Sequence, residues 1–341
     1  MKKRRWLIGL MFGVIAILGL STTPAHADQS SGAGFTMQIE KPANTIDETQ
    51  SYFNLKVRPN QKQTLAIKVI NLQDRQRTVR VTPVSAYTND NVQVAYRPHV
   101  AAGQTLANYQ FSDLVSGAQT VTVAPKATKV VKFQLRVPTH TFRGLIDGGF
   151  KAEGTDQKPA KAEKGFSINN RYALLMGATL QEDTKRVSPT LKLTAVTPKI
   201  VNQTTTLVAN LNNAKPVLFG QMTIKSQVTK VGSDKVLHSQ TKRNLTVAPS
   251  TAFGYRMDWN REPFKPGKYN LHLVATSGTK EWIFDQRFTI SRQEAAELNQ
   301  RGHNLKKSYL WLWILFGILL LILLLIAVYY YGRHQAKKSA E

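Results

Sequence analysis

Residues 129–137 read KVVKFQLRV, and this stretch decides the fold class. From Val131 onward an apolar residue occupies every second position, and polar or charged residues occupy the positions between. Residues 64–69 alternate in the same way. Successive side chains of an extended strand point to opposite faces of its sheet, so this pattern is typical of half-buried antiparallel strands. The sequence therefore predicts β-structure as the framework of the chain.

Short strand candidates separated by turn signals continue on both sides of this stretch. Turn signals such as Pro59-Asn60 and Ala102-Gly103 divide them. This spacing predicts an all-β protein with two immunoglobulin-like antiparallel β-sandwich domains. Residues 109–115 fit either a short helix or an edge segment. The other strand candidates are residues 35–40, 52–58, 78–88, 120–124, 144–153, 166–180, 190–197, 205–211, 221–230, 243–247, 253–259, 268–275 and 281–290.

The limit between the two sandwiches falls in a polar region. Residues 154–164 are polar and contain Pro159 and three Lys, so they form either the boundary loop or the exposed tip of a hairpin. In the second case the boundary lies at residues 180–188, where charged residues cluster. We favour this second placement, which predicts domains at residues 35–185 and 186–290.

A short repeat suggests that the two sandwiches are related. The letters TVAP occur at residues 122–125 and again at residues 246–249, and each copy leads into an alternating strand. After the second sandwich, Ser291 and Glu294 form a capping-box pattern that opens a short polar helix. We expect residues 291–308 to be a helical stalk.

The amino terminus has the pattern of a secretory signal peptide. Basic residues 2–5 precede an apolar run at residues 6–20, and the letters AHA at residues 25–27 fit a small-x-small cleavage site. The pattern predicts a signal peptide at residues 1–27, followed by a polar linker at residues 28–34. Everything between the linker and the stalk is therefore expected to be exported.

Residues 309–331 contain no charged residue and are dominated by Leu and Ile. At about 1.5 Å per residue this segment spans roughly 34 Å, enough to cross a bilayer core of about 30 Å. Tyr and Trp residues at both ends fit the two membrane interfaces. We therefore expect a single-pass cell-membrane protein. Its ectodomain should lie in the extracellular cell-wall space, and its basic tail, residues 332–341, in the cytoplasm.

The chain is strongly basic and lacks cysteine. Its net charge is +25, and removing the four positive charges of the leader and the net two of the tail leaves about +19 on the ectodomain. Such a charge favours polyanionic partners. An exported domain rarely meets nucleic acid, so anionic wall polymers or acidic proteins are the expected partners. General solvation of the surface is the alternative. The absence of cysteine argues against a disulfide-stapled ectodomain.

No pattern of catalytic or metal-ligating residues is present. The seven histidines are scattered without metal-ligand spacing, and no nucleophile motif occurs. Gly144 and Gly148-Gly149 are interpreted as turns or a bulge. The sequence therefore predicts a protein that is not an enzyme and needs no cofactor or metal. Aromatic and basic residues that flank one loop are candidates for a glycan platform: Tyr87, Asn89, Tyr96 and Arg97.

A set of short motifs in a fixed order resembles the WxL-interacting proteins of Gram-positive bacteria. The resemblance covers nearly the whole exported part. It implies a peptidoglycan-binding domain, then a domain that binds host or partner proteins, then one membrane helix. The motifs are YFNL at residues 52–55, QTL at 63–65, YTN at 87–89, GLIDGG at 144–149, NRYA at 170–173, APS at 248–250, GKY at 267–269 and WIF at 282–284.

Two functions follow as hypotheses. The first is a membrane-anchored binding scaffold that attaches WxL-domain surface proteins at the cell wall and contacts peptidoglycan, or an anionic wall polymer, and a host protein. The second is an accessory factor in cell-wall assembly or processing. The neighbouring carboxylates Asp47-Glu48 and Glu182-Asp183 lie in polar turns, and the lack of an acid/base pair in a plausible cleft favours the first hypothesis.

Overall fold

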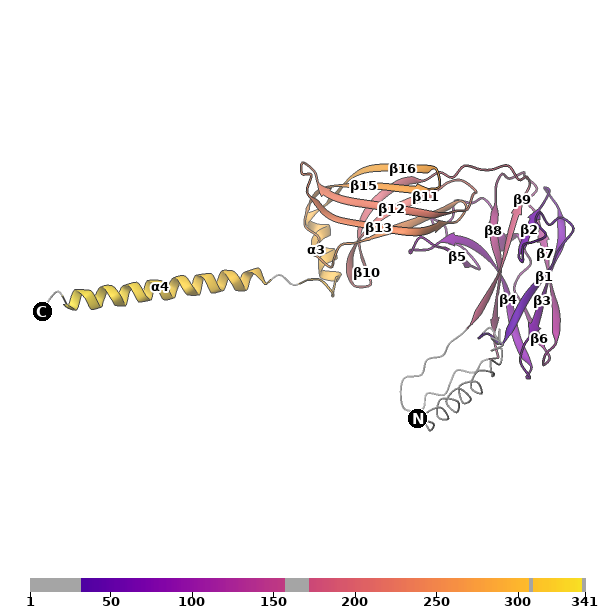
Figure 1. Ribbon diagram of the computed structural model, residues 1–341, viewed down its shortest axis with the longest axis horizontal. Helices are drawn as coiled ribbons and strands as arrows, with labels where there is room; N and C mark the ends of the chain where they lie inside the picture. The colour runs from indigo at the N-terminus through magenta and orange to yellow at the C-terminus, as the bar shows by residue number, and fades with distance from the viewer. Residues whose placement is uncertain (1–31, 157–171, 307–308, 339–341) are drawn as a thin grey trace, which may run out of the picture.

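Antiparallel sheets account for most of the computed structural model, which describes residues 32–156, 172–306 and 309–338 (Figure 1). The all-β fold class is confirmed, with one long apolar helix at the carboxy-terminal end. The predicted signal peptide, residues 1–27, lies outside the described residues. So do residues 157–171, which include most of the predicted hairpin tip (residues 154–164) and the start of the strand predicted at residues 166–180.

The first sandwich packs a three-stranded sheet against a six-stranded sheet (Figure 1). All strand pairs are antiparallel except that of β2 and β9, which run parallel. A single turn of helix, α2 (Phe111–Leu114), occupies the segment for which the sequence left helix or edge open. The smaller sheet has the order β1 (Phe35–Glu40), β3 (Lys62–Asn71), β7 (Thr128–Arg136), and the larger has β2 (Phe53–Lys56), β9 (Ala173–Gln181), β8 (Ile146–Gly154), β4 (Arg77–Thr88), β5 (Val94–Arg97), with β6 (Gln119–Val123) also paired to β4.

The second sandwich repeats this arrangement with a three-stranded and a four-stranded sheet. All of its strand pairs are antiparallel. The smaller sheet has the order β10 (Lys192–Val201), β11 (Thr204–Asn213), β14 (Thr251–Asp258). The larger has the order β13 (Val236–Val247), β12 (Phe219–Lys230), β15 (Gly267–Ser277), β16 (Lys280–Ile290).

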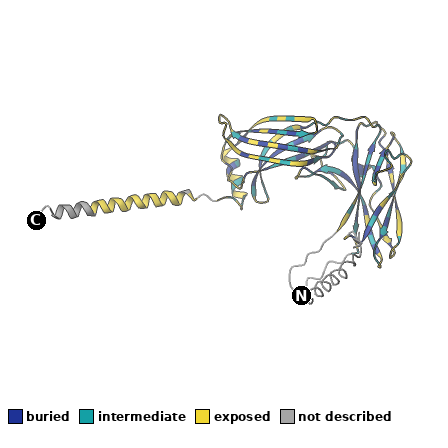
Figure 2. Ribbon diagram, in the orientation of Figure 1, coloured by how far each residue is buried: buried dark blue, intermediate teal, exposed yellow. Residues whose placement is uncertain are grey.

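Each sandwich encloses its own apolar core between its sheets (Figure 2). In the first, the ring of Phe150 contacts those of Phe53, Phe111 and Phe133, with centroids 4.7–5.9 Å apart. Such aromatic contacts are worth about 0.5–1.5 kcal/mol each beyond the area that they bury. The alternation read from the sequence thus corresponds to the buried positions of the strands.

The repeated TVAP letters occupy the same structural position in both sandwiches. In each, a buried Asn at the end of a strand donates hydrogen bonds from its amide to main-chain carbonyls. Asn71, at the end of β3, reaches Ala124 O (2.9 Å), and Asn213, at the end of β11, reaches Ala248 O (2.9 Å). The residue after each proline takes a positive φ, 53° at Lys126 and 45° at Ser250, as the third position of a type II turn requires.

The interpretation of Gly148 and Gly149 as a turn or bulge was wrong. Both lie inside β8, which pairs with β9 in continuous register. A Cβ at Gly148 would stand 2.4 Å from the Cβ of Phe111, and one at Gly149 would stand 2.4 Å from Met176 O. The two glycines therefore let α2 and β9 approach the strand. Gly144 does lie in a turn, with φ 82°.

Two helices follow the second sandwich. Ser291 caps α3 (Arg292–Arg301) by accepting a hydrogen bond from Glu294 N, as the capping pattern predicted. The helix packs on the sandwich: Ala295 is buried, and the Asn299 side chain bonds both N and O of Phe264. Helix α4 (Leu310–Lys338) projects away from the sandwiches (Figure 1), and its apolar stretch Trp311–Tyr329 is long enough to cross a membrane.

The β4–β5 hairpin joins the two sandwiches. Val92, at its tip, is fully buried and belongs to the core of the second sandwich. Thr88 N donates to Thr251 Oγ1, Ala248 N donates to Thr88 Oγ1, and Val94 N donates to Thr246 Oγ1, at 2.9–3.2 Å. Buried hydrogen bonds fix direction as well as distance. The contact therefore holds the two sandwiches in one orientation.

Candidate functional site

The four predicted glycan-platform residues all lie on or beside the β4–β5 hairpin, but they do not share one face. The guanidinium of Arg97 lies over the ring of Tyr87, 3.6 Å from its centroid, and Arg97 Nη1 donates to Gln104 Oε1 at 3.0 Å. Tyr96 pairs with Ala86, next to Tyr87 in β4, so it points to the opposite face of the sheet. The structure brings together Tyr87 and Arg97 and separates them from Tyr96.

Asn89 holds the turn of the hairpin. Its Oδ1 accepts hydrogen bonds from the main-chain N of Asn91 (2.9 Å) and of Gln93 (3.1 Å). This is the local side-chain bonding that makes Asn common in turns. The turn places Val92 in the left-handed region, with φ 57°, which is unusual for a β-branched residue. Asn89 therefore acts on the position of Val92 at the joint between the sandwiches.

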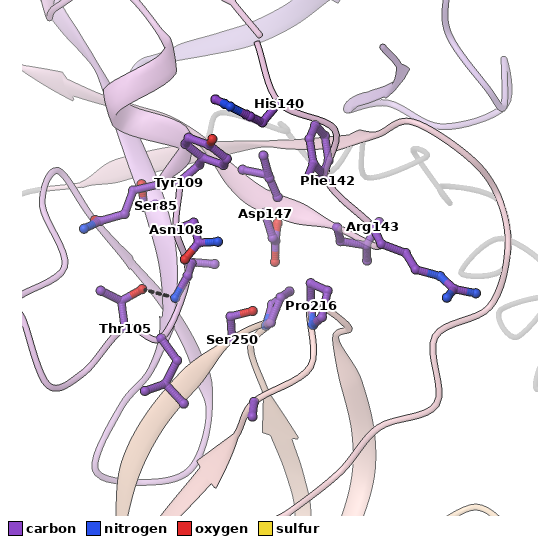
Figure 3. A pocket seen from close by; sticks show the side chains of 18 of the residues that line it. Ser85, Thr105, Asn108, Tyr109, His140, Phe142, Arg143, Asp147, Pro216 and Ser250 are labelled. Atoms are coloured by element: carbon purple, nitrogen blue, oxygen red, sulfur yellow. Dashed lines mark hydrogen bonds between the residues drawn. The ribbon is translucent and has the colours of Figure 1, made fainter. Parts of the chain in front are cut away.

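Beside this joint, the two sandwiches enclose a cavity of about 550 Å³ (Figure 3). Its walls come from the loop before α2, from the segment that leads into β8, and from two turns of the second sandwich. Two main-chain hydrogen bonds close its sides, from Leu106 N to Ser250 O and from Leu145 N to Pro216 O, both at 2.7 Å. The cavity therefore exists only where the sandwiches meet.

Asp147 of β8 lies in the wall of this cavity and is only 9% exposed. Burial raises the pKa of its carboxyl group to about 7, although a hydrogen bond from the main chain of Gly148 acts in the opposite direction. Its Oδ2 atom is buried and has no hydrogen-bond partner in the protein. Figure 3 shows the carboxyl group directed towards Pro216 and Ser250 and away from His140. An unpaired buried carboxyl oxygen costs about 1–3 kcal/mol or more, which a ligand donor can recover.

The chemistry of the cavity suits recognition of hydroxyl or amide groups. Near neutral pH the Asp147 carboxyl exists in both forms, so it can donate or accept a hydrogen bond. Tyr109, Asn108 and Ser250 add polar atoms to a lining that is about half polar and half apolar (Figure 3). Burial, and then the negative charge of the nearby Asp147 carboxylate, raises the pKa of the Tyr96 phenol. One predicted platform residue thus belongs to the surroundings of Asp147.

Asp147 was missed as a site residue when the sequence was read, although it stands in the GLIDGG motif. A lone Asp inside an apolar strand, followed by two glycines, was the available signal. The second sandwich contributes Pro216 and Ser250 to the cavity that Asp147 faces, and the sequence does not reveal this contact. Among the described residues, no cluster of three His, Asp or Glu side chains is arranged to hold a metal ion.

Two family models match the chain in succession. The model described as "WxL Interacting Protein, peptidoglycan binding domain" matches residues 35–153. The model described as "WxL Interacting Protein, host binding domain" matches residues 163–300. The second match begins before β9, a strand that pairs within the first sandwich. Together the two models cover both sandwiches and α3.

Solved structures resemble the chain only weakly. The class 5 fimbriae chaperone CfaA is 10% identical over 74% of this chain and 98% of its own, with a TM-score of 0.26. A chaperone–tip adhesin complex of CFA/I fimbriae is 11% identical over 74% and 98%, with a TM-score of 0.30. The CsuC–CsuE chaperone–tip adhesion subunit complex of Acinetobacter baumannii is 10% identical over 67% and 93%, with a TM-score of 0.29.

No curated protein sequence matches the chain. The two family models are therefore the comparison that assigns it, and they agree with the family that its motifs resemble. Both models are named for binding domains, and they match the two sandwiches in the order in which the chain builds them. This chain belongs to the WxL-interacting protein family.

Proposed function

We propose that the protein is a membrane-anchored scaffold that binds peptidoglycan through its first sandwich and a WxL-domain surface protein through its second. The observation that carries this proposal is the order of the chain: a domain of a peptidoglycan-binding family, a domain of a host-binding family, and then a helix of membrane length. Because the second model is described as a host binding domain, a host protein is a further proposed partner of the second sandwich. The resulting role is that of a cell-surface adaptor.

We place the anchor in the cell membrane with the sandwiches outside. The apolar stretch of α4 is exposed along its whole length, which only lipid or another protein can cover (Figure 2). The basic residues beyond it support a cytoplasmic carboxy terminus. The signal peptide expected at residues 1–27 supports export of everything before the helix.

For peptidoglycan, we place the contact at the joint of the first sandwich. The Asp147 cavity offers hydrogen bonds to neutral sugar and amide groups. The Tyr87–Arg97 pair, on the β4–β5 hairpin, offers a flat, cationic surface. The expected ectodomain carries a net charge of about +19, which favours anionic wall polymers as additional partners. Both kinds of contact belong to one insoluble ligand, the cell wall.

For the WxL-domain protein, we place the contact at the outer edge of β16. This strand pairs with β15 over its full length without a register shift, and no described strand pairs with its other side. By contrast, the β14 edge is closed by Gln240, whose side chain bonds Arg256 O and Asp258 N. The β10 edge contains Pro198 and a bulge. An unprotected edge strand is where another chain can add a strand.

The experiment is sedimentation of the full chain, held in lipid nanodiscs, with purified sacculi. The proposal predicts retention on sacculi without release of soluble wall fragments. Asp147→Asn and Arg97→Gln should each weaken retention several-fold, whereas Lys129→Gln, on an exposed position of β7, should not. Released fragments would instead support the assembly or processing role. No retention at any salt concentration would contradict wall binding.

A further inference from the structure

A second cavity, of about 530 Å³, lies on the second sandwich at the end that leads to α4. All but one of its lining residues are polar, and four are cationic: Lys242, Arg256, Arg261 and Lys306. A single carboxylate, Asp258, accompanies them. The cavity therefore carries a net positive charge and offers many hydrogen-bonding groups, which is the composition of an anion site.

The cations of this cavity are incompletely neutralised by the protein. Arg256 pairs with Asp90 of the first sandwich, and Lys306 Nζ lies 4.0 Å from Glu262 Oε1. Within the described parts of the chain, neither Lys242 nor Arg261 takes part in an ion pair. Burial, and then the positive charge of Arg256, lowers the pKa of Lys242. Crowding like charges is unfavourable, so a bound anion would relieve a cost built into the fold.

Two tight turns hold the mouth of the cavity. Asn202 and Gln203 form one with φ 49° and 64°, and Asn260 and Arg261 form the other with φ 54° and 59°. Consecutive residues in the left-handed region are typical of two-residue hairpin turns. Main-chain bonds tie the segment after α3 to both turns, from Asn304 N to Gln203 O (3.2 Å) and from Lys306 N to Arg261 O (2.8 Å). The site is thus fixed to the end of the chain's exported part.

The position of Lys306 sets the distance to the membrane. Tyr309, at the start of the apolar segment, follows it by three residues, which can span at most about 11 Å. Figure 1 shows α3 and the end of β10 on the side of the second sandwich from which α4 departs. If α4 crosses the bilayer, as the proposed function requires, the cavity lies at the height of the lipid headgroups.

We propose that this cavity binds the phosphate of an anionic lipid headgroup and so fixes the second sandwich on the membrane surface. The four cations supply charge and hydrogen bonds to the phosphate oxygens, and Asn202 and Asn260 supply donors to headgroup hydroxyls. A phosphate of a wall polymer has the same chemistry. The short tether to the membrane segment favours the lipid.

The test uses the full chain in nanodiscs that contain equal amounts of phosphatidylglycerol and phosphatidylcholine. Native mass spectrometry counts the lipids that remain on the protein. Phosphatidylglycerol should be retained in preference to phosphatidylcholine, and Lys242→Gln with Lys306→Gln should reduce that preference about fivefold per lysine. The matched control is Lys225→Gln with Lys280→Gln, two exposed lysines of the four-stranded sheet that lie outside the cavity, and it should retain the preference.

Several results would overturn the proposal. One is a wild-type protein without preference for phosphatidylglycerol, and another is an equal loss in both double variants. The cavity would be assigned to a wall polymer instead if the protein, held in phosphatidylcholine nanodiscs, bound a soluble glycerol-phosphate oligomer and showed no preference for phosphatidylglycerol. Failure of the chain to enter nanodiscs at all would contradict the membrane anchor, and so is distinguishable from failure of the headgroup site.

Discussion

At the scale of single residues, two buried groups connect the fold to its binding role. Asp147 faces the cavity between the sandwiches with an unpaired oxygen, and Val92 reaches from the first sandwich into the core of the second. Both lie at the joint, and both are held in states that cost free energy: a desolvated carboxyl and a left-handed β-branched residue. Costs of this kind persist where the surrounding structure enforces them.

Asp147 should make stability depend on pH. Its folded pKa, about 7, lies above the ordinary value of 3.8, so the folded protein binds more protons than the unfolded one between these values. The free energy of unfolding should therefore fall as pH rises from about 4 to about 7 and then level off, by on the order of 4 kcal/mol from this residue. Asp147→Asn should remove that component.

The measurement is the melting temperature of the full chain in nanodiscs at a series of pH values. The difference between Asp147→Asn and the wild-type protein should grow in favour of the variant up to about pH 7. Using the difference cancels the titration of other groups. A difference that is constant across this range would show that the Asp147 carboxyl is not perturbed by burial.

Val92 should couple the two sandwiches. Val92→Ala removes two methyl groups from the core of the second sandwich and should lower stability by about 1–3 kcal/mol. The exposed neighbour Asn91 provides the control, because Asn91→Ala leaves the core intact. Hydrogen exchange should rise at β13 and β14 in the first variant only. Unchanged exchange there would mean that Val92 does not hold the joint.

Among the structural elements, the same side-chain hydrogen bonding from an Asn at a strand end to a turn occurs in both sandwiches. Asn213 at the end of β11 donates to Val217 O and Ala248 O and accepts from Lys215 N, and Asn71 plays the matching role in the first sandwich. Each binds the strand end to the TVAP turn. The TVAP repeat in the sequence therefore marks a repeated hydrogen-bonded corner. In each sandwich, the Asn whose side-chain amide completes the corner lies far from the TVAP letters along the chain.

Asn213→Ala should destabilise the second sandwich by about 3 kcal/mol, because it leaves one buried carbonyl oxygen, one half-buried carbonyl oxygen and one main-chain N–H without their partner. Asn212→Ala is the matched control, since no hydrogen bond of that side chain is part of the corner. Melting of both variants in nanodiscs gives the comparison. Equal melting temperatures would show that the corner contributes little.

The alternating strands were predictable because burial of one face imposes a period of two on the sequence. Residues 35–40 were predicted to the residue as β1, and most other strands overlap their predictions. The four-residue strand β5 was missed, because it is short and all four of its residues are half-buried. The parallel pairing of β2 with β9 was also missed, since it joins segments more than a hundred residues apart.

The candidate site was less predictable than the strands. Tyr87 and Arg97 come together, but only the strand register reveals that Tyr96 faces the other way. Asp147 faces a cavity to which the second sandwich contributes, and no local pattern in the sequence reports such a contact. Two expectations remain predictions. One is the domain limit at residues 185 and 186, and the other is the glycan role of Tyr87, Asn89, Tyr96 and Arg97.

In the whole molecule, the two sandwiches are connected by a fixed joint. The first sandwich, the joint and the second sandwich form one continuous body, from which α4 departs (Figure 1). In the proposed function, this fixed joint would hold the wall contact of the first sandwich and the β16 edge of the second at a constant separation. A membrane-anchored protein of this kind would set the height above the membrane at which a bound partner is displayed.

The proposed binding of a WxL-domain protein through the second sandwich can be measured by capture of the full chain, in nanodiscs, on an immobilised WxL-domain protein. The wild-type chain should be captured. Ile283→Asp, which places a charge at a 57% exposed position of β16, should reduce capture at least tenfold, whereas Leu237→Asp on β13 should not. Capture that is absent for the wild-type chain, or equal for both variants, would contradict the account.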